Sequence, residues 1–209
     1  MRLVLFLVLL MVATPITASD APPTILVLGD SISAGYGVAE KDGWVARLDE
    51  RLAAENYPHR VVNASITGDT SSGGLARLPK ALDRHEPAIV VIELGGNDGL
   101  RGQPLDAMRR NLQAMIDEAR AAGARVLLLG IRLPPNYGRA YIDRFIGVYE
   151  ELADTTGVAL VPRVLAGVGE RREHMQDDGI HPNAAGHEVI LDNVWPTLLP
   201  LIEATAEPA

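Results

Sequence analysis

The sequence predicts a three-layer α/β/α domain built around a parallel sheet. Short apolar runs such as 24–28 (TILVL) and 88–94 (AIVVIEL) have the length and composition of strands that are buried on both faces. Between these runs lie amphipathic stretches of helical length. No internal repeat, low-complexity tract or interdomain linker interrupts the alternation, so we expect 20–209 to form a single domain.

Five strand–helix units follow one another along the chain. We expect strands at 24–28, 60–63, 88–94, 125–129 and 158–161, and helices at 43–55, 72–84, 105–122, 141–155 and 184–201. Asn183 is the expected N-cap of the last helix, and Pro196 is expected to kink it. Five such units fit the flavodoxin-like strand order 2-1-3-4-5. In that order, ligands bind beyond the carboxyl ends of the strands, at the switch between strands 1 and 3.

The N-terminal residues 1–19 have the three-part layout of a secretory signal peptide. Arg2 supplies a positive charge, 3–13 is almost wholly apolar, and Pro15 ends this run. Small residues follow at 16–19, and we expect cleavage after Ala18 or Ser19. The apolar run is short for a membrane span, although an uncleaved anchor is the alternative. We therefore expect a periplasmic or secreted protein with no stable membrane insertion after cleavage.

Composition excludes several classes of function. The chain has no cysteine, which excludes disulfides, thiolate–zinc sites and cysteine nucleophiles. Its formal net charge is -8, which disfavours nucleic acid as a partner. Nothing in the sequence demands more than a monomer, and no cofactor is indicated.

Ser31 follows the first predicted strand in the segment Gly29-Asp30-Ser31-Ile32-Ser33. A serine between a buried strand and a helical turn has an exposed hydroxyl, and its N–H is well placed to meet an oxyanion. A plain N-cap is the alternative interpretation. The segment is not the Gly-x-Ser-x-Gly elbow of α/β-hydrolases, because Ser33 stands where the second glycine would be.

The loops after strands 2 and 3 carry a glycine and a carboxamide that could complete an oxyanion site. Gly68 would let a substrate approach its N–H closely, and Asn97 could donate from its side chain to the same oxyanion. Each loop could also be a simple turn. In the predicted strand order, these two loops and that of Ser31 are neighbours.

Asp178 and His181 lie three residues apart, just before the last helix. At this spacing the carboxylate can accept from His181 Nδ1–H and leave Nε2 to take the serine proton. A solvated histidine is the alternative for this segment alone. The conjunction of four such signals at four loops favours a serine hydrolase.

With these residues in place, the chain resembles the SGNH (GDSL-type) hydrolases, and within them the bacterial periplasmic thioesterase I / lysophospholipase / arylesterase subgroup. The similarity rests on the four blocks in order and on NASITGDTSSGGLARLP, VIELGGNDGLRG, IRLPPNYG and MQDDGIHPN. It implies the triad Ser31, Asp178 and His181, an oxyanion hole of Ser31, Gly68 and Asn97, and hydrolysis of acyl-CoA thioesters, lysophospholipids and aryl esters without metal or cofactor. It also implies substrate-binding segments, namely a mobile loop with Gly99, Leu100, Arg101 and Gly102 and an opposite wall with Pro134, Pro135, Asn136 and Tyr137.

Three other functions compete with this interpretation. A carbohydrate O-deacetylase would share the fold and the chemistry. A metal-dependent phosphoesterase could gather Asp30, Asp98, Asp178, His181 and His187 around divalent ions, although no Asp-x-Asp or His-x-His pair appears. A binding protein without turnover would not need catalytic residues in all four blocks.

Overall fold

The computed structural model describes residues 21–206 and contains one five-stranded parallel sheet in the order β2-β1-β3-β4-β5. The strands are β1 (Thr24–Gly29), β2 (Arg60–Asn63), β3 (Ile89–Glu93), β4 (Arg125–Leu129) and β5 (Ala159–Val161). The predicted strand order and fold class are therefore confirmed. The strand positions agree with the sequence patterns to within one or two residues.

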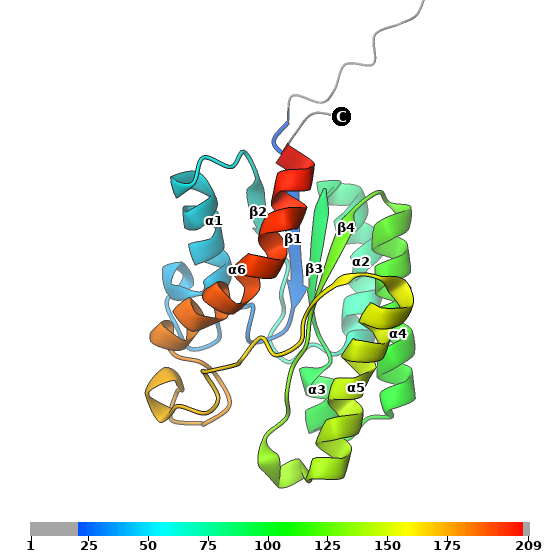
Figure 1. Ribbon diagram of the computed structural model, residues 1–209, viewed down its shortest axis with the longest axis vertical. Helices are drawn as coiled ribbons and strands as arrows, with labels where there is room; N and C mark the ends of the chain where they lie inside the picture. Colours follow the sequence, from blue (N-terminus) through cyan, green and yellow to red (C-terminus); the bar gives the residue numbers. More distant parts are fainter. Residues whose placement is uncertain (1–20, 207–209) are drawn as a thin grey trace, which may run out of the picture.

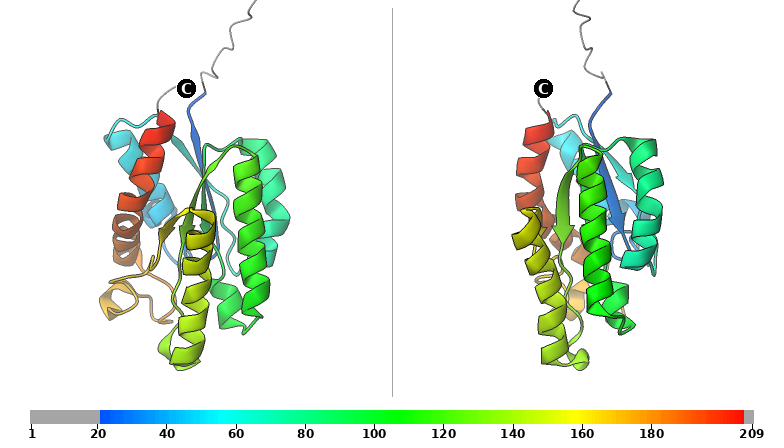
Figure 2. Two further views of the ribbon diagram at one scale, coloured as in Figure 1. Left: turned by 45° about the vertical axis from the view of Figure 1, so that its right-hand side comes forward. Right: turned by 90° about the vertical axis from the view of Figure 1, so that its right-hand side faces the viewer.

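Helices cover both faces of the sheet and make the outer layers (Figures 1 and 2). One layer holds α1 (Trp44–Ala54) and α6 (Ala184–Ala206), and the other holds α2 (Ser71–His85), α4 (Leu105–Ala121) and α5 (Arg139–Thr156). Their apolar stripes, predicted from the three-to-four-residue spacing, face the sheet. Leu48 and Leu52 of α1 and Leu112 of α4, for example, are fully buried.

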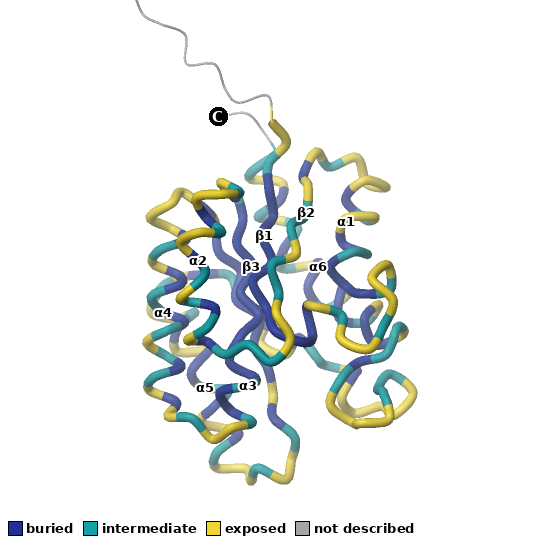
Figure 3. Tube along the Cα trace, turned by 180° about the vertical axis from the view of Figure 1, so that it is seen from behind, coloured by how far each residue is buried: buried dark blue, intermediate teal, exposed yellow. Residues whose placement is uncertain are grey.

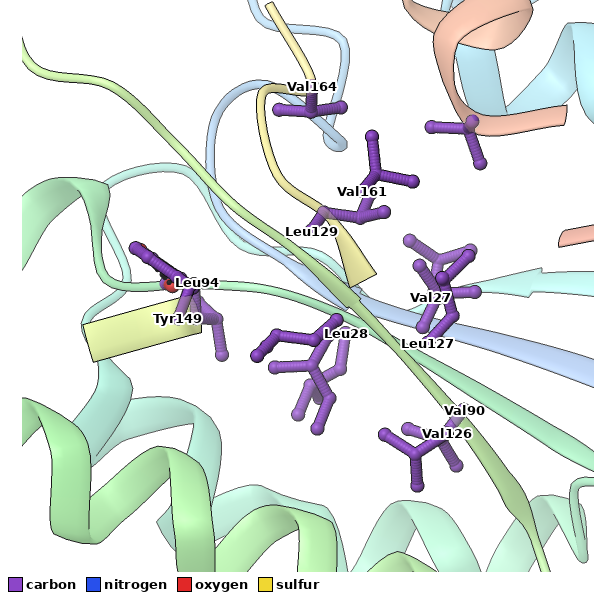
Figure 4. Close-up of a cluster of buried hydrophobic side chains, with 14 of the residues drawn as sticks. Val27, Leu28, Val90, Leu94, Val126, Leu127, Leu129, Tyr149, Val161 and Val164 are labelled. Carbon is purple, nitrogen blue, oxygen red and sulfur yellow. Dashed lines mark hydrogen bonds between the residues drawn. The ribbon is translucent and has the colours of Figure 1, made fainter. Parts of the chain in front are cut away.

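The core lies in the centre of the sheet. Every residue of β1 and β3 is buried, whereas the edge strand β2 is partly exposed (Figure 3). Figure 4 shows side chains from different strands packed together in this core, such as Val27 of β1 near Leu127 of β4, and Val90 of β3 beside Val126 of β4. A rigid centre of this kind holds the carboxyl ends of β1 and β3 in fixed register, with Gly29 beside Glu93.

Three features depart from the sequence prediction. The segment after β3 was expected to be a loop, but it forms the short helix α3 (Gly96–Leu100). Short 3-10 helices lie at Glu40–Asp42, Pro135–Tyr137 and Arg172–His174. The last helix runs five residues past its expected end and continues through Pro196 and Pro200, because its buried face extends to Ile202.

The expected signal peptide, 1–19, lies outside the described residues. Within 21–206, no helix combines the length and the apolar character needed to cross a membrane. The loops that carry the predicted site residues emerge at the edge of the sheet where α3 lies, at the bottom of the view in Figure 1.

Candidate active site

Ser31 lies two residues beyond the end of β1, in a tight helical turn. Ala34 N–H donates to Asp30 O at 2.9 Å, and Tyr36 N–H donates to Ser31 O at 3.0 Å. The turn folds back so closely on the end of β1 that a Cβ on Gly29 would lie 2.7 Å from Ser33 Cβ. The strand therefore needs glycine at its end, and the turn presents the Ser31 hydroxyl at the carboxyl edge of the sheet.

Glu93, the last residue of β3, fixes this turn by accepting hydrogen bonds from it. Its Oε2 accepts from Ser33 Oγ at 2.8 Å and from the N–H groups of Asp30 and Ser33, each at 3.3 Å. Ser33 Oγ in turn accepts from Trp44 Nε1 at 3.2 Å. Burial, together with the nearby charge of Asp30, raises the pKa of the Glu93 carboxyl well above its usual value. No role was predicted for this glutamate, because it is simply one residue of the apolar run AIVVIEL.

His181 joins Ser31 to Asp178 in an unbroken hydrogen-bonded chain. His181 Nε2 lies 3.0 Å from Ser31 Oγ, and His181 Nδ1 lies 2.6 Å from Asp178 Oδ2. The Tyr36 ring lies against the imidazole, with ring centroids 4.6 Å apart. These distances allow Nδ1–H to donate to the carboxylate while Nε2 accepts from the serine hydroxyl.

The second carboxylate oxygen of Asp178 fixes the loop that carries the histidine. Asp178 Oδ1 accepts from the N–H groups of Ile180 at 2.9 Å and His181 at 3.0 Å. The hydrogen bond from the His181 side chain, followed by those from the backbone, lowers the pKa of Asp178 to about 2. Asp178 is therefore an anion at all ordinary pH values, and it stabilises a positive charge on the imidazole.

Three hydrogen-bond donors are predicted to meet an oxyanion beside Ser31 Oγ, namely the N–H groups of Ser31 and Gly68 and the carboxamide of Asn97. Gly68 has a φ of +80°, a conformation that glycine adopts without strain. Within 21–206, the N–H groups of Ser31 and Gly68 have no acceptor. Asn97, in the first turn of α3, donates one Nδ2–H to Asp30 Oδ2 at 2.9 Å. Its second N–H remains to meet an oxyanion.

Asp30 ties the nucleophile turn to Asn97. Its Oδ1 accepts from Ile32 N–H at 3.0 Å, while its Oδ2 accepts from Asn97. Burial raises the pKa of Asp30 to about 6, against the opposing effect of these hydrogen bonds. The carboxyl is therefore close to neutral in mildly acidic solution, beside the place where an oxyanion would form.

A groove of about 580 Å³ opens beside Ser31 and runs under the loops that follow β3, β4 and β5. The surface of its wall is mostly apolar, and the large apolar side chains in it are Ile32, Leu100, Ile131, Leu133, Leu165, Met175 and Ile180. This volume lies within the range of small-molecule sites. In Figures 1 and 2, the segments that border the groove lie at the same end of the molecule as α3.

The predicted substrate-binding residues are divided between the groove and its surroundings. Leu100, Pro134 and Pro135 line the groove. The others, Gly99, Arg101, Gly102, Asn136 and Tyr137, are not among its lining residues; Arg101 Nη2 donates to Gly68 O at 2.8 Å, and Tyr137 Oη donates to Leu100 O at 2.9 Å. Sequence reasoning missed Ile32 and Ile131 as lining residues, and it missed several from the segment 163–180, which has no periodic pattern that marks a binding wall.

The residues considered for a metal site are dispersed. Asp98 accepts from Ser71 N–H and Oγ, and His187 Nδ1 accepts from Trp44 N–H. Within 21–206, no three His, Asp or Glu side chains are grouped in a way that could hold a metal ion.

Comparison with known proteins identifies the family of the chain. The model of the GDSL-like lipase/acylhydrolase family matches 27–189, which is most of the described sequence. This chain belongs to the GDSL-like lipase/acylhydrolase family. The resemblance noted from the sequence is thereby confirmed.

Two relatives of this GDSL-family chain are similar to it in sequence over nearly their whole length. The chain is 57% identical to the esterase TesA of Pseudomonas aeruginosa, over 90% of this chain and 93% of that protein. It is 43% identical to the thioesterase 1/protease 1/lysophospholipase L1 of Escherichia coli, over 94% of this chain and 92% of that protein. A crystal structure of TesA superposes with a TM-score of 0.84 at 59% identity and covers 85% of this chain and 99% of that chain.

Proposed function

We propose that this GDSL-family enzyme hydrolyses carboxylic esters and thioesters through an acyl-enzyme on Ser31. The observation that carries the proposal is the hydrogen-bonded chain Ser31–His181–Asp178 at the mouth of an apolar groove. A nucleophile, a base and an orienting carboxylate in this order are the requirements of acyl transfer by serine.

In the first half-reaction, His181 Nε2 accepts the Ser31 proton as Oγ attacks the substrate carbonyl carbon. The carbonyl oxygen becomes an oxyanion that accepts from Ser31 N–H, Gly68 N–H and the Asn97 carboxamide. His181 then gives its proton to the departing alcohol or thiol. The carbon–leaving-group bond breaks, and the acyl group stays on Ser31.

In the second half-reaction, water takes the place of the leaving group. His181 removes a proton from this water as the oxygen attacks the acyl carbon. The same three donors hold the second oxyanion, and the proton returns to Ser31 as the carboxylic acid departs. The chain's own residues supply every proton transfer in this sequence.

The apolar wall of the groove supports an acyl chain as the part of the substrate that it holds. Burying methylene groups against side chains such as Leu133, Leu165 and Ile180 contributes about 0.8 kcal/mol for each group. The relatives are an esterase and a thioesterase 1/protease 1/lysophospholipase L1, which supports ester, thioester and lysophospholipid substrates for this chain too. We further infer that 1–19 directs export, and that the mature domain acts as a monomer outside the cytoplasm.

The variant Ser31→Ala tests this function. It should abolish turnover of p-nitrophenyl and acyl-CoA substrates and leave the circular dichroism spectrum unchanged, because only one oxygen at the edge of the sheet is lost. Ser72→Ala is the matched control, since Ser72 is exposed on α2, and it should keep full activity. Near-normal activity in a folded Ser31→Ala enzyme would rule out the acyl-enzyme.

A further inference from the structure

Arg77 lies on α2 and uses all three nitrogens of its guanidinium group at the carboxyl edge of the sheet. Nε donates to Asp69 Oδ2 at 2.8 Å, Nη1 donates to Ala64 O, and Nη2 donates to Gly29 O at 3.2 Å. The arginine side chain is 22% exposed, and that of Asp69 is 12% exposed. A partly buried guanidinium in which every nitrogen donates a hydrogen bond holds its partners in one fixed arrangement.

The three partners belong to the two segments that provide backbone donors to the oxyanion. Gly29 ends β1 and stands two residues before Ser31. Ala64 and Asp69 lie on either side of the turn that carries Gly68. Gly29 O also accepts from Ile66 N–H at 3.0 Å, so the loop after β2 is joined to the end of β1 by both the backbone and Arg77.

This arrangement matters because an oxyanion hole depends on exact distances. Its donors must lie about 2.7–3.1 Å from the oxygen of the transition state. The turn that carries Ser31 N–H is held by the buried Glu93, which accepts from the N–H groups of Asp30 and Ser33 on either side of Ser31. Gly68 N–H lies on a partly exposed loop, which Arg77 and the bond from Ile66 hold against β1, while Arg101 holds Gly68 O from the end of α3.

We propose that Arg77 is a positioning residue that sets the Gly68 N–H relative to Ser31 in the oxyanion hole. The proposal rests on the acyl-enzyme function described above. Arg77 touches neither the substrate nor the reacting atoms. Its effect reaches the reaction through the backbone of the loop, and so it acts on the transition state more than on the bound substrate.

The conservative variant Arg77→Lys separates positioning from charge. Lysine keeps the positive charge for Asp69 but cannot reach three acceptors in one plane. We expect kcat for a p-nitrophenyl ester to fall about 10- to 100-fold, the range for misplacing one reacting or stabilising group, with KM changed less than about threefold. Arg47→Lys is the matched control, because Arg47 is 24% exposed and pairs with Asp42 and Glu188 on the opposite face of the sheet.

A second experiment adds guanidinium chloride at low millimolar concentration to Arg77→Ala. Recovery of part of kcat, without the same response in Arg47→Ala, would support a guanidinium that orients the loop. Wild-type kcat in Arg77→Lys, or an equal fall in kcat for Arg47→Lys, would overturn the positioning role. Either result would leave the proposed function intact, because labelling of Ser31 in the wild-type enzyme by a fluorophosphonate tests that function separately.

Discussion

The Asn97 carboxamide donates to the buried carboxyl of Asp30, with 2.9 Å between Nδ2 and Oδ2. This bond links α3, which follows β3, to the turn that follows the neighbouring strand β1. It orients the carboxamide so that its other N–H can face the space beside Ser31. It also places an acidic group with a raised pKa next to the expected oxyanion.

The first prediction concerns Asp30 and stability. Because the pKa of Asp30 is about 6 in the folded protein and 3.8 as its ordinary value, the folded state binds an extra proton between these values. This contribution makes the free energy of unfolding fall as pH rises from about 4 to 6, with no further change above that. Relative to wild type, Asp30→Asn should therefore gain stability across this window. Urea unfolding of both proteins at pH 4 to 7 measures the difference, and a constant difference would contradict the assignment.

The second prediction concerns Asn97. Asn97→Ala removes one donor that acts on the oxyanion, so kcat should fall about 100- to 1,000-fold while KM changes little. The fold should be kept, since Asn97 is only partly buried. Steady-state kinetics with an aryl ester tests this. A loss that appears only in KM would assign Asn97 to substrate binding instead.

The third prediction concerns Asp178. Asp178→Asn leaves a side chain of the same shape but favours the wrong tautomer of His181, so kcat should fall by about three to four orders of magnitude. Asp177→Asn is the matched control, because the neighbouring carboxylate is exposed and lies 3.5 Å from Arg172. If the two variants lost activity equally, Asp178 would have no special role.

The fourth prediction concerns the end of the groove that is lined by the segment after β5. Arg163 and Glu170 line the groove and form an ion pair of 2.6 Å. Three strand spacings, or about 14 Å, separate β5 from β1, which carries Ser31 at its end. An acyl chain that reaches this distance meets charge in place of apolar surface. The double variant Arg163→Leu/Glu170→Leu should therefore shift the preferred chain length upward, with a gain in kcat/KM of up to about fourfold for each added methylene group.

A series of p-nitrophenyl esters from acetyl to palmitoyl measures this shift. Arg109→Leu/Glu151→Leu is the matched control, because that ion pair has similar exposure and lies between α4 and α5. An identical chain-length profile in all three proteins would disprove the effect of the groove pair. A wild-type preference for acetyl over octanoyl would favour the carbohydrate O-deacetylase alternative.

The sequence predicted the strand order and the loops of the site because both depend on local patterns. Apolar runs mark the strands, and Ser31, Gly68 and Asn97 each follow a strand that the pattern identifies. The parallel arrangement then brings the three loops to one edge. His181 lies in a longer connection, and its distance from Ser31 became known only from the structure.

The features that the sequence did not reveal depend on tertiary contacts. Glu93 is one charged residue in an apolar run, and its hydrogen bonds exist only because β3 lies beside β1. In the sequence, Arg77 is an ordinary polar residue of a predicted helix, but its guanidinium group donates to Gly29 O at the end of β1. The groove residues Leu165 and Met175 come from a segment without periodicity, so no spacing rule indicated them.

The central claim is that Ser31 is an activated nucleophile. The most direct measurement is the intact mass of the folded enzyme after reaction with a fluorophosphonate probe, followed by peptide mapping. The account predicts one adduct, located on Ser31, which prior denaturation prevents. A folded protein without an adduct, or with an adduct on another residue, would contradict it.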